Sequence, residues 1–153
     1  MKKQFILFAA AALFMLSNLM FAQNLPTRGV IGKLFTKVQA DQMYGPVLKS
    51  VTINTSTLQA LLAKSPKYIM FNIINGQLVI ASHQRAVLSG QMATLNTNQP
   101  MKVFSTSVVN QLIQQGGYFT TTIELRTNNA LTITNGTTTD GGGEICPPFC
   151  PPY

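Results

Sequence analysis

The chain has 153 residues, of which 46% are hydrophobic and only 10% are charged. Typical globular domains carry about 25% charged residues, so this composition argues against a charge-rich helical bundle. Thr, Asn, Gln and Ser carry the polarity instead, which favours short strands with hydroxyl-bearing outer faces. Once the two ends are discounted, the length suffices for one domain with a core of its own.

The amino terminus has the form of a secretory signal peptide, predicted to span residues 1–22. Residues 1–3 contain two lysines, residues 5–16 are apolar, and Ala22 precedes a plausible cleavage point. A retained membrane anchor is the alternative, but Ser17 and Asn18 interrupt the apolar run and make it marginal for a span. We therefore expect an exported protein, whether periplasmic, cell-surface or secreted, that meets the membrane only transiently.

The charge of the chain is basic but dispersed. The formal net charge is +7, and loss of Lys2 and Lys3 with the signal leaves nine Lys and Arg against four Asp and Glu, or +5. A basic exported protein has a weak bias toward anionic partners, such as envelope polymers, although solubility alone also explains the charge. Because there is no Trp and no basic cluster, nucleic acid is not an expected partner.

The first elements after the predicted signal are short. The sequence indicates a strand at 30–34 and a helix at 38–43, with Thr36 as its N-cap and Gly45 at its end. A longer strand is expected from Val47, where apolar and polar residues alternate.

A helix and a β-hairpin follow this strand. The helix is expected to be capped by Ser56 or Thr55, and its apolar stripe is spaced i, i+3, i+4. Asn75-Gly76 then separates two β-prone runs, which is the strongest short-range signal for a hairpin because a type I′ turn needs positive φ at both positions. Residues 85–88 suggest one more strand.

The same order of elements recurs in the second half. At an offset of fifty positions, Leu62 falls on Leu112 and Tyr68 falls on Tyr118. The sequence thus predicts a duplicated βαββ unit, with copies at about 47–88 and 101–135.

The predicted fold class follows from this duplication. One helix stripe cannot cover a sheet face, but two can, which gives an α+β two-layer sandwich: a mixed, mostly antiparallel sheet with two helices on one face. The other face, rich in Thr, Asn and Gln, is the natural place for a partner. We expect a single α+β domain over 23–136 and a flexible Gly/Thr-rich and Cys-Pro tail over 137–153.

Catalytic constellations are hard to find in this sequence. It contains no serine-elbow, Walker or zinc-protease motif, and no metal or cofactor is expected. His83 is the only histidine, and Asp41 and Glu124 are the only acids outside the predicted tail. Glu124 alternates with Arg126 on one strand, which favours a surface charge pair over a glycosidase carboxylate pair. An enzyme is therefore not the favoured interpretation.

Cys146 and Cys150 are the most distinctive residues chemically. Export favours a disulfide, but its Cα atoms must lie about 4.4–6.8 Å apart. A polyproline segment would hold positions i and i+4 roughly 12 Å apart. A strained local disulfide, intermolecular crosslinks, and free thiols or soft-metal binding all remain open. The aromatic and proline residues beside them could also form a linear docking motif.

The leading hypothesis is a non-enzymatic binding or structural protein of the bacterial cell envelope or extracellular space. Its partner would be an envelope or extracellular protein or an anionic polymer. The alternatives are a secreted enzyme or enzyme inhibitor with a site between the two repeats, or a redox or metal role of the cysteine tail. The candidate ligand-contacting residues are Tyr68, Tyr118, His83, Arg85 and Arg126, although a tyrosine at a strand start is more often a packing residue.

Overall fold

The computed structural model describes residues 29–96 and 98–146. The predicted signal peptide and Cys150 lie outside the described residues. Among the described helices, none has the length and hydrophobicity needed to cross a membrane.

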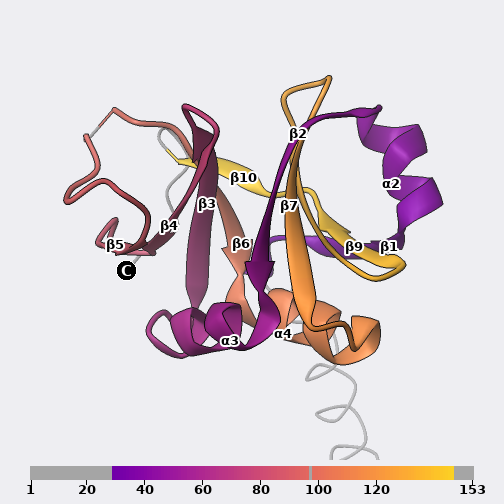
Figure 1. The fold of residues 1–153 in the computed structure, drawn as a ribbon, viewed down its shortest axis with the longest axis horizontal. Coiled ribbons are helices and arrows are strands. Elements are labelled where there is room, and N and C mark those ends of the chain that lie inside the picture. Colours follow the sequence, from indigo (N-terminus) through magenta and orange to yellow (C-terminus); the bar gives the residue numbers. More distant parts are fainter. Residues whose placement is uncertain (1–28, 97, 147–153) are drawn as a thin grey trace, which may run out of the picture.

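Within this part of the chain the protein is α+β, with three helices and two antiparallel sheets (Figure 1). We call them sheet A, with strand order β1-β9-β8-β7-β2, and sheet B, with strand order β10-β6-β3-β4-β5. The strands are β1 Lys33–Thr36, β2 Val47–Asn54, β3 Tyr68–Ile74, β4 Gln77–Ser82, β5 Val87–Ser89, β6 Met101–Ser105, β7 Thr120–Arg126, β8 Leu131–Asn135, β9 Thr138–Gly141 and β10 Glu144–Cys146. The helices are α2 Lys37–Tyr44, α3 Thr55–Ala63 and α4 Thr106–Gly116.

The α+β class is confirmed, but the arrangement differs from the single sheet that the sequence predicted. The reason is that the two predicted units exchange strands. The first strand of the first unit, β2, pairs with β7, while the first strand of the second unit, β6, pairs with β3. Both sheets therefore contain strands from both halves of the chain. The strand–helix–strand–strand order does occur twice, and its origin in a duplication stays a prediction.

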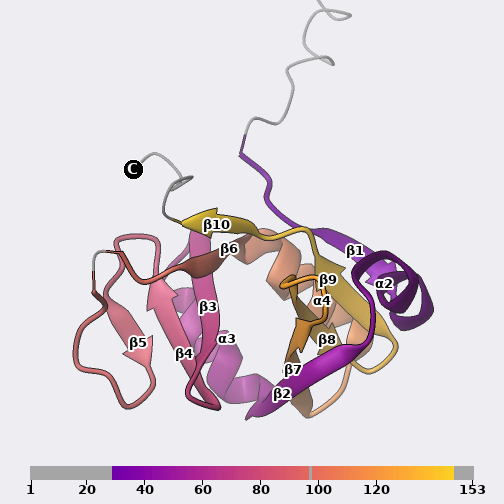
Figure 2. The same cartoon turned by 90° about the horizontal axis from the view of Figure 1, so that it is seen from above.

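The helices α3 and α4 lie side by side beneath the lower ends of the two sheets, as Figures 1 and 2 show. The buried stripe of α3 has its counterpart in α4 at a separation of 51 positions, one more than the sequence offset suggested. Leu58, for example, corresponds to Val109. The main core lies between the sheets and these helices. It is formed by Leu58, Leu61, Leu62, Ile69, Phe71, Ile80, Phe104, Val109, Leu112, Ile113, Ile123, Leu131 and Ile133.

Local signals in the sequence are reproduced at several points. Thr36 and Gln39 form a full capping box at the start of α2. Asn75 and Gly76 both have positive φ, at 52° and 80°, as a type I′ hairpin turn requires. The cap of α3 is shifted by one or two positions, because the side chain of Asn54 accepts the Ser56 amide at 3.0 Å.

Residues 138–146 differ from the predicted flexible tail, because they add one strand to each sheet. β9 lies between β1 and β8, and β10 pairs with β6. Glycine permits this close packing: a Cβ on Gly143 would lie 2.5 Å from the ring of Phe104. The Gly-rich composition predicts a tail without packed residues. Here the glycines give the larger core residues room.

Candidate functional site

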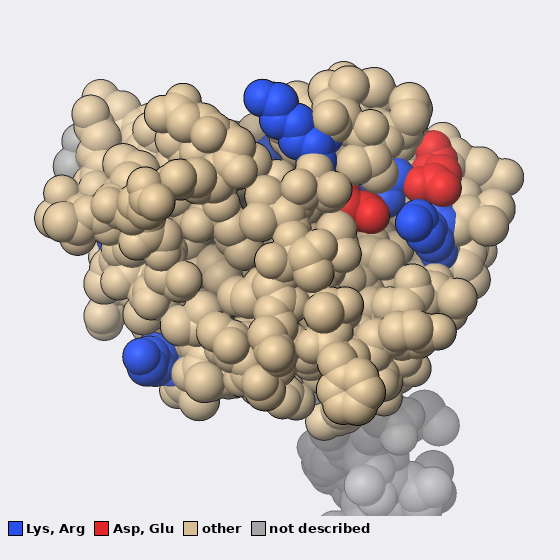
Figure 3. Space-filling view, viewed as in Figure 1, with Lys and Arg blue, Asp and Glu red and all other residues tan. Residues whose placement is uncertain are grey.

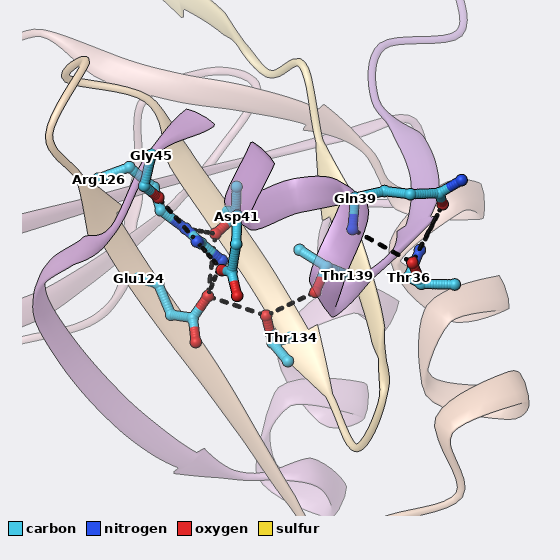
Figure 4. A network of polar contacts seen from close by, with 9 residues as sticks. Thr36, Gln39, Asp41, Gly45, Glu124, Arg126, Thr134 and Thr139 are labelled. Atoms are coloured by element: carbon cyan, nitrogen blue, oxygen red, sulfur yellow. Dashed lines mark hydrogen bonds and ion pairs between the residues drawn. The ribbon is translucent and has the colours of Figure 1, made fainter. Parts of the chain in front are cut away.

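A buried polar network occupies the outer face of sheet A, beneath α2. Alternation along β7 turns Ile123 and Leu125 toward the interior and Glu124 and Arg126 outward. The Arg126 side chain has no exposed surface. Its Nη2 lies 2.6 Å from Glu124 Oε2, and its Nη1 forms an ion pair with Asp41 of α2 (Figure 4).

Further hydrogen bonds hold this network together. Arg126 donates to the Gly45 carbonyl at 3.0 Å and to Thr132 Oγ1 at 2.9 Å. Glu124 Oε2 accepts from Thr132 at 3.1 Å and from Thr134 at 3.0 Å. One guanidinium therefore bridges the two carboxylates that the sequence marked as a conceivable catalytic pair. The network fastens α2 to the sheet.

The Thr-rich face that the sequence proposed for a partner is therefore the outer face of sheet A. Its end near α2 is covered by that helix, whereas Ser50 and Thr52 on β2 are exposed. Figure 3 shows a largely uncharged surface, with the acidic side chains gathered on the right, beside α2.

Asp140 on β9 is buried with little compensation. It pairs with Leu34 and Ile133, which places it on the core face of sheet A. The residue has no exposed surface, and neither carboxylate oxygen has a hydrogen-bond partner. Burial raises the pKa of Asp140 to about 8, and the nearby Lys33 amide offsets this only in part. Burial, and secondarily the Asp140 charge, also raises the pKa of Tyr44.

A pocket opens between the two sheets at the end away from α3 and α4. We call it the inter-sheet pocket, and its cavity volume is about 70 Å³. Both sheets contribute to it, since β3, β6 and β10 belong to sheet B and β7 and β8 to sheet A. It is lined by Asn72, Pro100, Met101, Lys102, Leu125, Asn129, Leu131 and Ile145.

Lys102 is the only charged residue that lines the inter-sheet pocket. It is half-buried, and desolvation lowers the pKa of its amine. The ion pairs within the described residues are both made by Arg126, so Lys102 has no carboxylate partner there. The sequence does not single out Lys102 as a site residue, although its spacing of two positions from the core residue Phe104 indicates that both share one strand face.

The two tyrosines that the sequence placed at matching positions lie in different environments. Tyr68 is 4% exposed and belongs to a second apolar cluster on the outer face of sheet B. Tyr118 is 58% exposed, in the turn between α4 and β7, where its amide donates to the Asn135 side chain at 2.9 Å. The structure therefore does not bring them together as a pair.

His83 and the predicted acids belong to separate parts of the fold. His83 follows β4 in sheet B, where its amide donates to Ser65 Oγ at 3.2 Å and its Nδ1 lies 3.5 Å from the same oxygen. Asp41 and Glu124 are held by Arg126 on sheet A. No group of three His, Cys, Asp or Glu is placed to hold a metal ion in the described ranges.

Arg85 connects the loop after β5 with the last described strand. Its guanidinium donates to the carbonyls of Asn96 at 2.9 Å, Gln99 at 2.8 Å and Cys146 at 3.3 Å. Cys146 is fully buried at the end of β10. Since Cys150 lies outside the described residues, the three alternatives for these two cysteines, a local disulfide, intermolecular crosslinks, and free thiols or soft-metal binding, all stay predictions.

Comparison of the chain with protein-family models, with curated proteins and with solved structures found no match. The class that can be stated is thus structural: an α+β protein with two antiparallel sheets, each of which contains strands from both halves of the described chain. Function has to be argued from the site itself.

Proposed function

We propose that this protein is an exported, non-enzymatic binding module of the cell envelope or extracellular space, with the inter-sheet pocket as its ligand site. The observation that carries the proposal is Lys102, a half-buried cation without a carboxylate partner in a pocket formed by both sheets. Half-burying an unpaired charge costs free energy, and a binding site is a common reason to keep one.

The chemistry of the lining supports binding rather than catalysis. The lining contains no His, Asp, Glu, Ser, Thr or Cys, so Lys102 has no acid or base partner within the pocket. The polar groups that could have formed a catalytic set are used elsewhere, as with Asp41 and Glu124 on Arg126. Export is supported by the basic, apolar and small-residue order of residues 1–22.

Export is tested by the intact mass of the full chain after expression in a bacterial host. We expect protein in the periplasm or medium with the mass of residues 23–153. Reductant and thiol alkylation in the same experiment establish whether the cysteines are bridged, crosslinked or free. Protein that remains in the cytoplasm with residues 1–22 attached would overturn the export part of the proposal.

A further inference from the structure

We propose that the inter-sheet pocket binds a small organic monoanion, a carboxylate with a short hydrocarbon chain, whose carboxylate pairs with Lys102. This inference rests on the proposed function and adds the class of ligand. It follows from three features of the pocket: the sign of its charge, its apolar wall and its size.

The charge of the pocket is positive because strand alternation turns the neighbouring acids away from it. Lys102 pairs with Ile145 of β10, whereas Glu144 pairs with Val103 and so lies on the opposite face of sheet B. In sheet A, Leu125 lines the pocket, and Glu124 lies on the outer face with Arg126. The ammonium of Lys102 therefore faces a space without a counter-charge among the described residues.

An anion in this space would recover the interaction that Lys102 lacks. Desolvation already weakens the charged form of the amine, as the lowered pKa of Lys102 shows. A carboxylate within hydrogen-bond distance would favour the charged form again, and such charge-assisted pairs are among the stronger hydrogen bonds. A cationic or neutral ligand would leave the ammonium uncompensated.

The rest of the pocket wall is largely apolar and therefore favours a ligand with a hydrocarbon chain. Leu125, Leu131 and Ile145 line it from two sheets, and Leu131 is only 2% exposed. At the rim, the Asn72 amide is already used, because it donates to the Pro100 carbonyl at 2.7 Å and accepts from the Ile73 amide. The Asn129 side chain also lines the pocket and carries no hydrogen bond within the described residues, so it can donate to a ligand oxygen.

The size of the pocket limits the ligand. A volume of about 70 Å³ accommodates a carboxylate with a few carbon atoms, and it is too small for a folded segment or several sugar rings. A short-chain carboxylate satisfies all three features together.

The test is a titration of the isotope-labelled protein, followed by NMR, with three probes of equal chain length: propanoate, propan-1-ol and propylammonium. We expect propanoate to shift the signals of Asn72, Lys102, Leu125 and Leu131, and to bind at least tenfold more tightly than propan-1-ol. Propylammonium should bind more weakly still. In the unmodified chain, propanoate should also raise the pKa of the Lys102 amine, which the Lys102 side-chain signals report directly.

Matched variants separate the charge of Lys102 from its shape. Lys102→Met keeps the chain length without charge and should weaken the binding of propanoate at least tenfold, whereas Lys102→Arg should change this affinity less than threefold. Lys49→Met removes an exposed lysine from β2 and should leave binding unchanged. If Lys102→Met fails to fold, the pKa measurement on the unmodified chain decides the question.

Two results would overturn the inference in distinguishable ways. Equal binding of propanoate and propan-1-ol, without a change in the pKa of Lys102, would reject the anionic ligand class and leave a binding pocket. Absence of binding by all three probes would reject the pocket as the ligand site. Export is measured separately and does not depend on either result.

Discussion

The outer faces of the two sheets are covered in chemically opposite ways. Sheet A carries the Arg126 network beneath a helix, α2. Sheet B carries an apolar cluster that includes Tyr68 and Met70, with Met92 and Leu95 of the loop after β5 packed against it. The strand orders correspond, since β7, β8 and β9 follow one another in sheet A as β3, β4 and β5 do in sheet B.

This difference shows that the pairing pattern of a sheet does not fix the chemistry of its surface. An apolar cluster tolerates small changes in volume because its attraction is non-directional. A buried ionic network depends on every member, since an unpaired charge that remains is costly. We therefore expect sheet A to lose more stability than sheet B when one central residue is replaced.

The largest effect is expected for Arg126→Met. This change leaves Glu124 buried at 4% exposure without its cation, and it should lower the free energy of unfolding by about 4 kcal/mol. Denaturant unfolding at neutral pH measures it, with the exposed Lys49→Met as control. Adding Glu124→Leu should restore part of the loss. A loss below about 1 kcal/mol would mean that hydrogen bonds from Thr132 and Thr134 suffice for Glu124.

A smaller effect is expected on sheet B for Met70→Ala. Met70 is fully buried in the apolar cluster, so its truncation should cost about 3 kcal/mol through lost contacts and a residual cavity. The matched control is Met43→Ala on α2, because Met43 is 56% exposed and should change stability by less than about 0.5 kcal/mol. If Met70→Ala proved more costly than Arg126→Met, the proposed order of the two faces would be reversed.

The most gradual effect concerns Asp140, the member of sheet A that lacks a partner. Its folded pKa of about 8 lies above the value of 3.8 that an aspartate has in the unfolded chain, so the folded protein holds a proton that the unfolded chain releases. This group's contribution to stability is complete below about pH 4 and is lost as the pH rises toward 8. Between these two pH values, the contribution of Asp140 to the free energy of unfolding falls by about 1.4 kcal/mol per pH unit.

Asp140→Asn mimics the protonated carboxyl and should flatten this pH dependence. Denaturant unfolding measured from pH 5 to pH 8 should show that the free energy of unfolding of the variant increases relative to that of the unmodified protein as the pH rises. Glu144→Gln, at an exposed position, is the control and should keep the slope of the unmodified protein. Parallel curves for the Asp140 variant and the unmodified protein would contradict an uncompensated carboxyl at this position.

The sequence predicted the elements better than their assembly. The Asn75-Gly76 turn and the capping box at Thr36 are local, so the residues involved carry the information themselves. The apolar stripe of α4 is local as well. Strand exchange is not: nothing within β2 shows that it pairs with β7, some seventy positions later, because many partners with the same alternation would satisfy it.

The site was predicted less well for a similar reason. Arg126 and Glu124 were expected as a surface pair because alternation alone does not reveal that α2 covers that face. Lys102 was overlooked, since a single lysine in a strand becomes distinctive only when the opposite sheet encloses it. Asp140 was assigned to the tail because a Thr- and Gly-rich stretch has no hydrophobic pattern to mark a strand.

The exchange of strands also bears on when the chain can fold. The last described strands, β9 and β10, add to sheets whose other members come from as early as Lys33, so neither sheet is complete until nearly the whole chain is present. Pairings between such distant residues form slowly. We therefore expect a nascent chain with this topology to stay unfolded for most of its synthesis, a state compatible with the export that we propose.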